Sequence, residues 1–310
     1  MKSMPNVWSC NEWDPLQEVI VGNPLGARFP TADPSTQVAE FPDRSIEEIP
    51  QGSFPQWIID ETEEDLSEFI AVLEGEGVTV KRPETWAHDA TFSTNDWESQ
   101  GYYNYCPRDL MLVIGDQIIE TPNVLRSRAQ ESFSYRSMMV DYMKSGAKWY
   151  SAPRPMLRDS LFDVDLKKPT PRNDEPAFDA ANVLRLGHID STFVALRPGL
   201  MLCNPARVND DNLPAILKEW DIIYSPPMEG TNQYGADYLS KSIGSEWIDM
   251  NLFSISPHLV AVDRDQTNLI KLLEKNGLDV APLKLRHSKM LGGGYHCVTL
   301  DIRRAGTLQR

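Results

Sequence analysis

The sequence has 310 residues but little cysteine, and its four cysteines lie far apart. Cys10, Cys106, Cys203 and Cys297 form no CxxC pair. Disulfide frameworks and structural zinc sites need closely spaced cysteine or histidine residues, so this spacing argues against both. It is typical of reduced thiols in a cytoplasmic protein. Each isolated cysteine is by default a small buried apolar residue, and only its surroundings can make it a nucleophile.

The sequence also lacks basic runs and long apolar stretches. Its 30 Lys and Arg against 45 Asp and Glu give a formal net charge of −15. Nucleic acids and anionic membrane surfaces both attract basic segments, so neither is the expected partner. No stretch approaches the roughly eighteen apolar residues of a transmembrane helix, and the first ten residues lack a signal-peptide core. We expect a cytoplasmic protein with a small soluble substrate.

What the sequence does contain is a repeated order of predicted elements. Apolar and β-branched runs around turn signals predict three hairpins, at 110–114 with 117–120, 192–196 with 200–203, and 252–255 with 259–262. A helix and a strand ending near proline follow each hairpin, at 127–145 and 148–153, 212–219 and 221–226, and 267–276 and 278–282, with Gly277 as a helix C-cap. The pattern favours a true repeat, although ordinary α/β domains also alternate helices with strands.

A fourth copy comes first in the chain and a fifth is incomplete. The fourth has strands at 18–21 and 78–83 and a helix at 61–76, with Leu66, Phe69, Ile70 and Leu73 on one face. Residues 177–186 predict the first strand of the fifth copy, yet His188 follows Gly187 without a partner strand, helix or closing strand. We interpret this as a module truncated at 187/188; the alternative is that the segment is only a loop.

Two long segments, 22–56 and 84–100, are rich in Pro, Ser, Thr, Asp and Glu. We expect them to form loops over one face, where lids and specificity elements usually lie. The whole chain, 1–310, is expected to form a single domain.

The most informative segment for chemistry is Gly292-Gly293-Gly294-Tyr295-His296-Cys297. Glycines permit unusual backbone angles and a close approach of a ligand to the main chain. Cys297 opens the apolar run 298–302 and would lie at a strand end, where a lowered thiol pKa would make it a nucleophile. Its neighbour His296 should point to the opposite face. The alternative is a glycine-rich turn before a buried strand.

Two further clusters could complete a site. Asp179 and His188-Ile189-Asp190 combine carboxylates, which can bind a guanidinium, with a histidine suited to proton transfer. In the run 102–109, Asp109 could bind a cationic group while an aromatic side chain packs on its aliphatic stem. Alone, each of these residues is as well explained by structural hydrogen bonding or by loop capping, so they indicate a site only together with Cys297.

Several motifs, in order along nearly the whole chain, resemble those of arginine amidinotransferases, a family of guanidino-group-modifying enzymes. The likeness is strongest to the cyanobacterial saxitoxin-pathway members. The motifs are Asn11-Glu12-Trp13-Asp14-Pro15, Cys106-Pro107-Arg108-Asp109, Phe178-Asp179-Ala180-Ala181-Asn182, His188-Ile189-Asp190-Ser191-Thr192, and the run 292–297. The resemblance implies an α/β propeller of five ββαβ modules with pseudo-fivefold symmetry, the pentein fold, with the active site at its centre.

The resemblance also implies roles for single residues. Cys297 would be the nucleophile, His188 the general acid and base, and Asp179 the carboxylate that grips the guanidinium. The substrate pocket would be lined or oriented by Tyr103, Asp109, Asp190, Arg207 and Ser245. Gly244 departs from the family pattern, because relatives often carry serine there. No metal or cofactor is implied, and a homodimer is compatible with the resemblance.

The reaction implied is transfer of the amidino group from L-arginine to an amine acceptor, an intermediate of saxitoxin synthesis by resemblance, with release of L-ornithine. Covalent transfer through an amidino-cysteine predicts ping-pong kinetics. Two alternatives remain at this point. One is an arginine deiminase-like hydrolase; the other is a non-catalytic deletion remnant of an amidinotransferase.

Overall fold

The structure is a computed structural model that describes residues 6–164, 170–172, 174–182, 188–189, 191–209, 211–213, 215–230 and 234–306. The side chains of residues 182, 188, 189 and 216 lie outside this description. In the described part, no helix is long and apolar enough to cross a bilayer.

The first sheet joins the two ends of the described chain. Strand β1 (Leu16–Val21) pairs antiparallel with β17 (Thr299–Arg304) and parallel with β2 (Thr79–Lys81). The connection from β1 to β2 contains the long helix α2 (Gln56–Gly75). The residues of β1 are apolar except for Gln17 and Glu18. Val19, Ile20 and Val21 are fully buried, as expected for a strand that is covered on both faces.

Three more sheets in the described residues repeat this order of an antiparallel pair followed by a parallel strand. Their elements are β5 (Met111–Ile114), β6 (Gln117–Glu120), α3 (Arg136–Lys144) and β7 (Lys148–Ser151); β10 (His188–Ile189), β11 (Phe193–Arg197), β12 (Leu200–Cys203) and β13 (Asp221–Tyr224); and β14 (Phe253–Ser254), β15 (Leu259–Asp263), α5 (Thr267–Lys275) and β16 (Asp279–Leu283). The predicted order of strands is therefore confirmed for four copies, and in the described residues a helix lies between the strands in three of them.

Two of the predicted helices differ from the structure. The helix expected at 212–219 is replaced, among the described residues, by the short 3-10 turn η7 (Ala215–Leu217). The helix expected at 127–145 is divided into η3 (Arg126–Arg128), η4 (Glu131–Tyr135) and α3. The reason lies in the arginines of η3, whose side chains turn inward to buried partners. In a regular helix, the side chains of Arg126 and Arg128 would point to different sides of the helix.

The segment interpreted as a truncated module is not a strand where the structure describes it. Residues 177–182 contain the 3-10 turn η6 (Ala180–Asn182), and residues 183–187 lie outside the described chain. The prediction of a strand is therefore wrong for 177–182. The backbone of β10 pairs with β11 and adds a fourth strand to that sheet. His188 thus directly adjoins the hairpin β11–β12.

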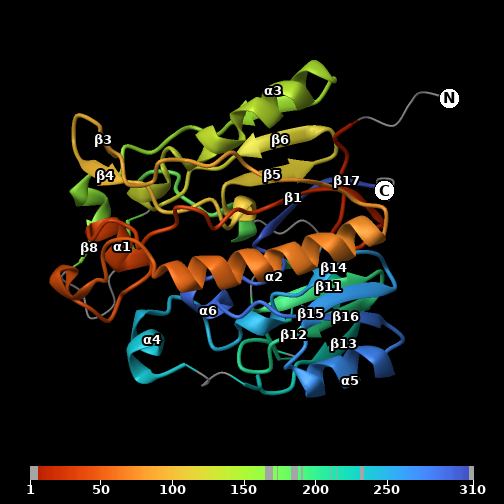
Figure 1. Ribbon diagram of the computed structural model, residues 1–310. Coiled ribbons are helices and arrows are strands. Elements are labelled where there is room, and N and C mark those ends of the chain that lie inside the picture. The colour runs from red at the N-terminus through yellow and green to blue at the C-terminus, as the bar shows by residue number, and fades with distance from the viewer. Residues whose placement is uncertain are drawn as a thin grey trace.

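Short elements lie in the loops between the larger elements. They are α1 (Pro34–Ala39), η1 (Ile46–Glu48), β3 (Thr91–Ser93), β4 (Glu98–Gln100), η2 (Pro107–Asp109), η5 (Asp159–Leu161), β8 (Phe162–Asp163), β9 (Thr170–Pro171), α4 (Ala236–Lys241), η8 (Ile248–Met250) and α6 (Ser288–Leu291). Of these, α1, β3, β4, β8 and α4 gather at the left of Figure 1.

Helix α2 crosses the middle of the molecule, between the β5–β6 sheet and the β14–β16 sheet (Figure 1). Its predicted apolar face is confirmed, since Leu66, Phe69 and Leu73 are fully buried and Ile70 packs beside them. The Phe69 ring meets the rings of Phe253 and Tyr295 edge-on, with centroids 6.1 and 5.1 Å away. Helix α2 therefore supports the segment that leads to Cys297.

Candidate active site

The glycine-rich run places Cys297 in a tightly filled turn before β17. Gly292 ends α6 with φ +70°, a conformation that favours glycine. A Cβ on Gly293 would lie 2.5 Å from the Cys106 sulfur, and one on Gly294 would lie 2.7 Å from Asn251. The expected unusual backbone angle is therefore confirmed at Gly292, while the expected approach of a ligand stays a prediction and the close neighbours of Gly293 and Gly294 are protein groups. Cys297 itself is only 3% exposed.

Asn251, which directly follows η8, forms hydrogen bonds with two atoms of Cys297. Its Oδ1 accepts from the Cys297 backbone N–H at 2.9 Å, and its Nδ2 donates to the Cys297 sulfur at 3.1 Å. The backbone oxygen of Asn251 also accepts from the His296 N–H. His296 points elsewhere, with Nε2 3.3 Å from Glu12 Oε2. His296 and Cys297 thus have different side-chain partners, but both lie in a turn before β17 and not on the strand that the prediction assumed.

The segment 102–109 packs directly against the Cys297 turn. The Tyr105 hydroxyl donates to the Gly293 carbonyl at 3.0 Å, and Arg108 Nε donates to the His296 carbonyl at 2.8 Å. The buried Cys106 thiol lies within hydrogen-bonding reach of Cys297. Two of the three predicted clusters therefore meet in the folded chain.

Arg108 lies in a buried charged group behind this turn. Its guanidinium contacts Asp301 Oδ1 at 2.5 Å and Glu12 Oε2 at 3.3 Å, and Asp301 Oδ2 accepts from Arg304 at 2.7 Å. Glu12 belongs to the first family motif and Arg108 to the second, while Asp301 follows the last. The motifs read along the chain therefore converge around one buried ionic network.

Asp109 and Tyr103, both predicted pocket residues, surround a buried arginine. Arg128 Nη1 donates to Asp109 Oδ2 at 2.5 Å, and the guanidinium lies 5.0 Å from the centre of the Tyr103 ring. Arg128 also binds Glu131 through two nitrogens, at 2.6 and 3.0 Å. Burial raises the pKa of Glu131, and Arg128 opposes that rise. Burial raises the pKa of Tyr103, so its hydroxyl stays protonated.

The second predicted cluster is described only in part. Asp179 Oδ1 accepts from the Ala181 N–H at 2.8 Å and so begins η6, which packs against η2, the turn that carries Asp109. The backbone of His188 pairs with Val194 in β11, but the His188 side chain lies outside the described atoms. Asp190 lies outside the described residues altogether. The structure therefore brings the Asp179 segment next to the Asp109 segment.

The remaining two predicted residues lie in surface-facing turns. Arg207 is exposed, and its Nη1 donates to Thr192 Oγ1 at 3.2 Å, at the end of the His188 motif. Ser245 accepts from the Trp247 N–H at 3.1 Å and starts η8, which leads to Asn251. At Gly244 an added Cβ would lie 2.8 Å from the Lys289 Cα. The Lys289 backbone thus occupies the space that a serine side chain would need.

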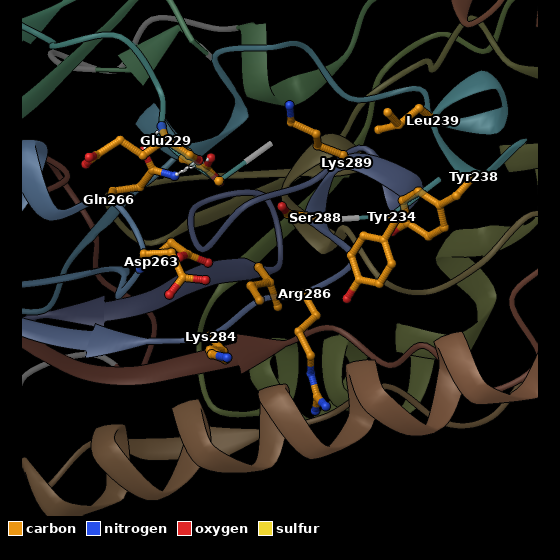
Figure 2. A pocket seen from close by; sticks show the side chains of 14 residues that line it. Glu229, Tyr234, Tyr238, Leu239, Asp263, Gln266, Lys284, Arg286, Ser288 and Lys289 are labelled. Carbon is orange, nitrogen blue, oxygen red and sulfur yellow. Dashed lines mark hydrogen bonds between the residues drawn. The ribbon is translucent and has the colours of Figure 1, made fainter. Parts of the chain in front are cut away.

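A separate hollow is lined in part by Asp249 of η8 and by Ser288 and Lys289 of α6. Tyr234 and Tyr238 stand at one end and Glu229 and Gln266 at the other, while Arg286 points away toward α2 (Figure 2). Asp249 accepts from Gln266 Nε2 at 2.9 Å. Burial, together with the nearby Asp263, raises the pKa of Asp249 to about 7. Burial likewise lowers the pKa of Lys289.

Sequence reasoning missed three groups at this site. Asn251 stands in the apolar run Met250-Asn251-Leu252, and a polar residue inside such a run is the available signal. The sequence presents Cys106 only as part of a motif and Arg128 only as part of a predicted helix. The structure shows all three within one contact of Cys297 or Asp109.

No family model matches the chain. Inosamine-phosphate amidinotransferase 1 of Streptomyces griseus is 44% identical over 336 residues, which cover 95% of this chain and 96% of the relative. Glycine amidinotransferase of Xenopus tropicalis is 33% identical over 359 residues, which cover 98% and 84%. The chain belongs to the amidinotransferase family. The expected resemblance is confirmed, and this amidinotransferase is a transferase enzyme.

Solved structures agree on the fold. The inosamine-phosphate amidinotransferase StrB1 of Streptomyces griseus superposes with a TM-score of 0.93 at 44% identity, covering 98% of both chains. SxtG of Microseira wollei, from the saxitoxin biosynthetic pathway, gives 0.89 at 33% identity, covering 98% and 99%. Of these two, the inosamine-phosphate enzyme is more similar, which reverses the order of similarity expected from the motifs. The arginine dihydrolase ArgZ, at 13% identity, shares the fold alone.

Proposed function

We propose that this amidinotransferase moves the amidino group of L-arginine to an amine acceptor through a covalent adduct on Cys297. The observation that carries the proposal is the meeting of Cys297, Cys106 and Asn251 where two family motifs, 106–109 and 292–297, contact each other. The relatives include a glycine amidinotransferase and an L-arginine:L-lysine amidinotransferase, and glycine and lysine are both amines.

The proposed reaction has two half-reactions that share one nucleophile. The Cys297 thiolate attacks the guanidino carbon, the carbon–nitrogen bond to ornithine breaks, and His188 supplies the proton that leaves with the ornithine amine. The acceptor amine then attacks the amidino-cysteine, loses a proton to His188, and departs with the amidino group as the thiolate re-forms. Asp179 grips the guanidinium, and Tyr103, Asp109, Asp190, Arg207 and Ser245 line or orient the pocket.

A test of this mechanism uses arginine labelled at the guanidino carbon and no acceptor. The label should appear on the peptide that contains Cys297, and double-reciprocal plots with varied acceptor should be parallel. Cys297→Ala should lower turnover by about four orders of magnitude or more while the thermal midpoint stays close to that of the natural protein. Cys203→Ala, at a buried cysteine of β12, is the matched control and should retain activity. Intersecting lines with no labelled peptide would exclude the covalent route.

The acceptor is proposed as an amine of low molecular weight, with the saxitoxin-pathway intermediate and inosamine phosphate as the two leading candidates. The first comes from the motif resemblance and the second from the more similar relatives. Ornithine release should depend on one of these amines, with glycine and lysine as further members of the panel. Citrulline and ammonia formed from arginine alone would instead support a hydrolase.

We also propose that the chain is a five-module pentein ring in which the module at 187/188 is truncated. The alignment with the Streptomyces glaucescens inosamine-phosphate enzyme runs over 341 residues, more than this chain has, so the relative carries residues without a counterpart here. The turn η6 also stands where a fifth first strand was expected. An intact mass of the natural protein well above 35.1 kDa would contradict the truncation. A matching mass with no arginine turnover would favour the non-catalytic remnant.

A further inference from the structure

We propose that Asn251 and Cys106 are positioning residues that hold the Cys297 sulfur as a thiolate by donating hydrogen bonds to it from two sides. The inference rests on the proposed role of Cys297 as nucleophile. It assigns to these two side chains the task that an adjacent base or cation performs at other catalytic cysteines.

The orientation of the Asn251 carboxamide is fixed by its own contacts. Its Oδ1 accepts the Cys297 backbone N–H at 2.9 Å, so the Nδ2 end must face the sulfur, 3.1 Å away. A flipped carboxamide would place its N–H groups against the Cys297 N–H, donor against donor. Gly294 packs against Asn251 so closely that a Cβ there would lie 2.7 Å from it, which leaves the asparagine little room to move. Asn251 therefore presents an N–H to the sulfur in the folded chain.

The Cys106 thiol approaches the same sulfur from the other segment. Cys106 has no exposed surface, and its side chain is hydrogen-bonded with Cys297. Burial raises the pKa of Cys106, and the hydrogen bond with Cys297 opposes that rise. With Cys297 as the thiolate, the neighbouring Cys106 thiol is the partner that can donate its proton in this hydrogen bond. Gly293 lies between the two cysteines, and a Cβ there would be 2.5 Å from the Cys106 sulfur and 3.1 Å from the Cys297 Cβ. The absent side chain is what lets the thiols meet.

Two donors matter because Cys297 is almost completely buried. A buried anion without hydrogen bonds reverts to its neutral form, since desolvation penalises the charge. The cation behind the turn, Arg108, is already compensated by Asp301 and Glu12. Hydrogen bonds to a charged group are the stronger ones, so both donors can stabilise the thiolate directly.

The test measures how fast iodoacetamide alkylates Cys297 at each pH, followed by mass spectrometry of its peptide. This readout needs neither arginine nor an acceptor. In Cys106→Ala we expect the midpoint of the pH profile to rise, with alkylation at neutral pH slower by on the order of tenfold, which is about one pKa unit. Cys106→Ser keeps a donor of similar size and should stay near the natural profile. Cys203→Ala is the control for losing a buried cysteine elsewhere.

Asn251→Asp gives the second arm. Its carboxylate can still accept the Cys297 N–H but turns an oxygen, not an N–H, toward the sulfur, so we expect a larger rise of the midpoint. Unchanged midpoints in Cys106→Ala and Asn251→Asp would overturn the proposal, and a shift in only one would overturn the assignment of the other residue. If Asn251→Asp does not fold, the Ala and Ser variants of Cys106 still decide the case. Transfer activity that survives in Cys297→Ala would refute the proposed function without touching these profiles.

Discussion

Arg128 binds Asp109 at one end of its guanidinium and Glu131 along the other edge. The contact with Asp109 is 2.5 Å long and the two contacts with Glu131 are 2.6 and 3.0 Å long, and all three are buried. Arg128 Nη2 also donates to the Cys106 carbonyl at 3.1 Å. The arginine therefore orders the turn that carries both Asp109 and Cys106. Arg128 has no proposed role in the reaction, but it positions Asp109, proposed to line the substrate pocket, and Cys106, proposed to position Cys297.

Replacing Arg128 should destabilise the protein strongly. Arg128→Met leaves Asp109 and Glu131 buried and without their cation, and breaking one partner out of a buried ion pair costs about 3–5 kcal/mol. Urea unfolding measures the change. Lys144→Met is the control, because Lys144 and Asp141 form an exposed pair 3.8 Å apart that should contribute less than about 1 kcal/mol. Equal effects in the two variants would contradict the structural role of Arg128.

A methyl group at residue 293 should disturb the pair of thiols. In Gly293→Ala the new Cβ would meet the Cys106 sulfur at 2.5 Å, so one of the two cysteines must move. We expect transfer activity to fall by at least about tenfold, since small displacements of reacting groups have such effects. Gly75→Ala, at the end of α2 with no heavy atom within 4 Å, is the matched control. It should keep full activity and gain up to about 1 kcal/mol of stability. Full activity in Gly293→Ala would show that the thiol contact is not needed.

Asp249 should make the stability depend on pH. Its pKa is about 7 in the folded chain, against an ordinary value of 3.8, so the folded state holds a proton that the unfolded state releases. The free energy of unfolding should therefore fall as pH rises from about 4 to 7, by at most about 1.4 kcal/mol per pH unit from this group.

Asp249→Asn removes that titration. Relative to the natural protein, the variant should gain stability as the pH rises through the same window, as measured by urea unfolding at a series of pH values. Asp237→Asn is the control, because Asp237 is 86% exposed beside Lys241. A constant difference between Asp249→Asn and the natural protein at all pH values would mean that Asp249 titrates normally.

Local patterns were enough to predict the three hairpins and the apolar face of α2. Turn residues such as Gly115 and Gly199, both with positive φ, interrupt apolar runs at the positions where the chain reverses. Hydrophobic periodicity gave the wrong secondary structure where tertiary contacts determine the conformation of the chain. The apolar residues of 212–219 suit a helix, yet Leu213 and Leu217 pack onto the cluster around Trp13 from a short turn and its flanking loop.

The site was predicted as a set of motifs but not as a geometry. Cys297 was identified from the glycines before it, whereas its contacts come from residues 46 and nearly 200 positions away, Asn251 and Cys106. No spacing rule connects such residues, because the distance between them is set by the packing of whole sheets. The roles of His188, Asp179 and Asp190 stay predictions.

The pairing of β1 with β17 has a consequence for the order of synthesis. Strand β1 begins at residue 16, whereas its antiparallel neighbour begins only at residue 299, so β1 leaves the ribosome long before its partner is made. Until then one edge of β1 has no partner and invites pairing with other chains. Cys297 lies directly before β17, in that same later segment. Residues 297–304 must therefore be made before either the first sheet or the candidate nucleophile can take its final place.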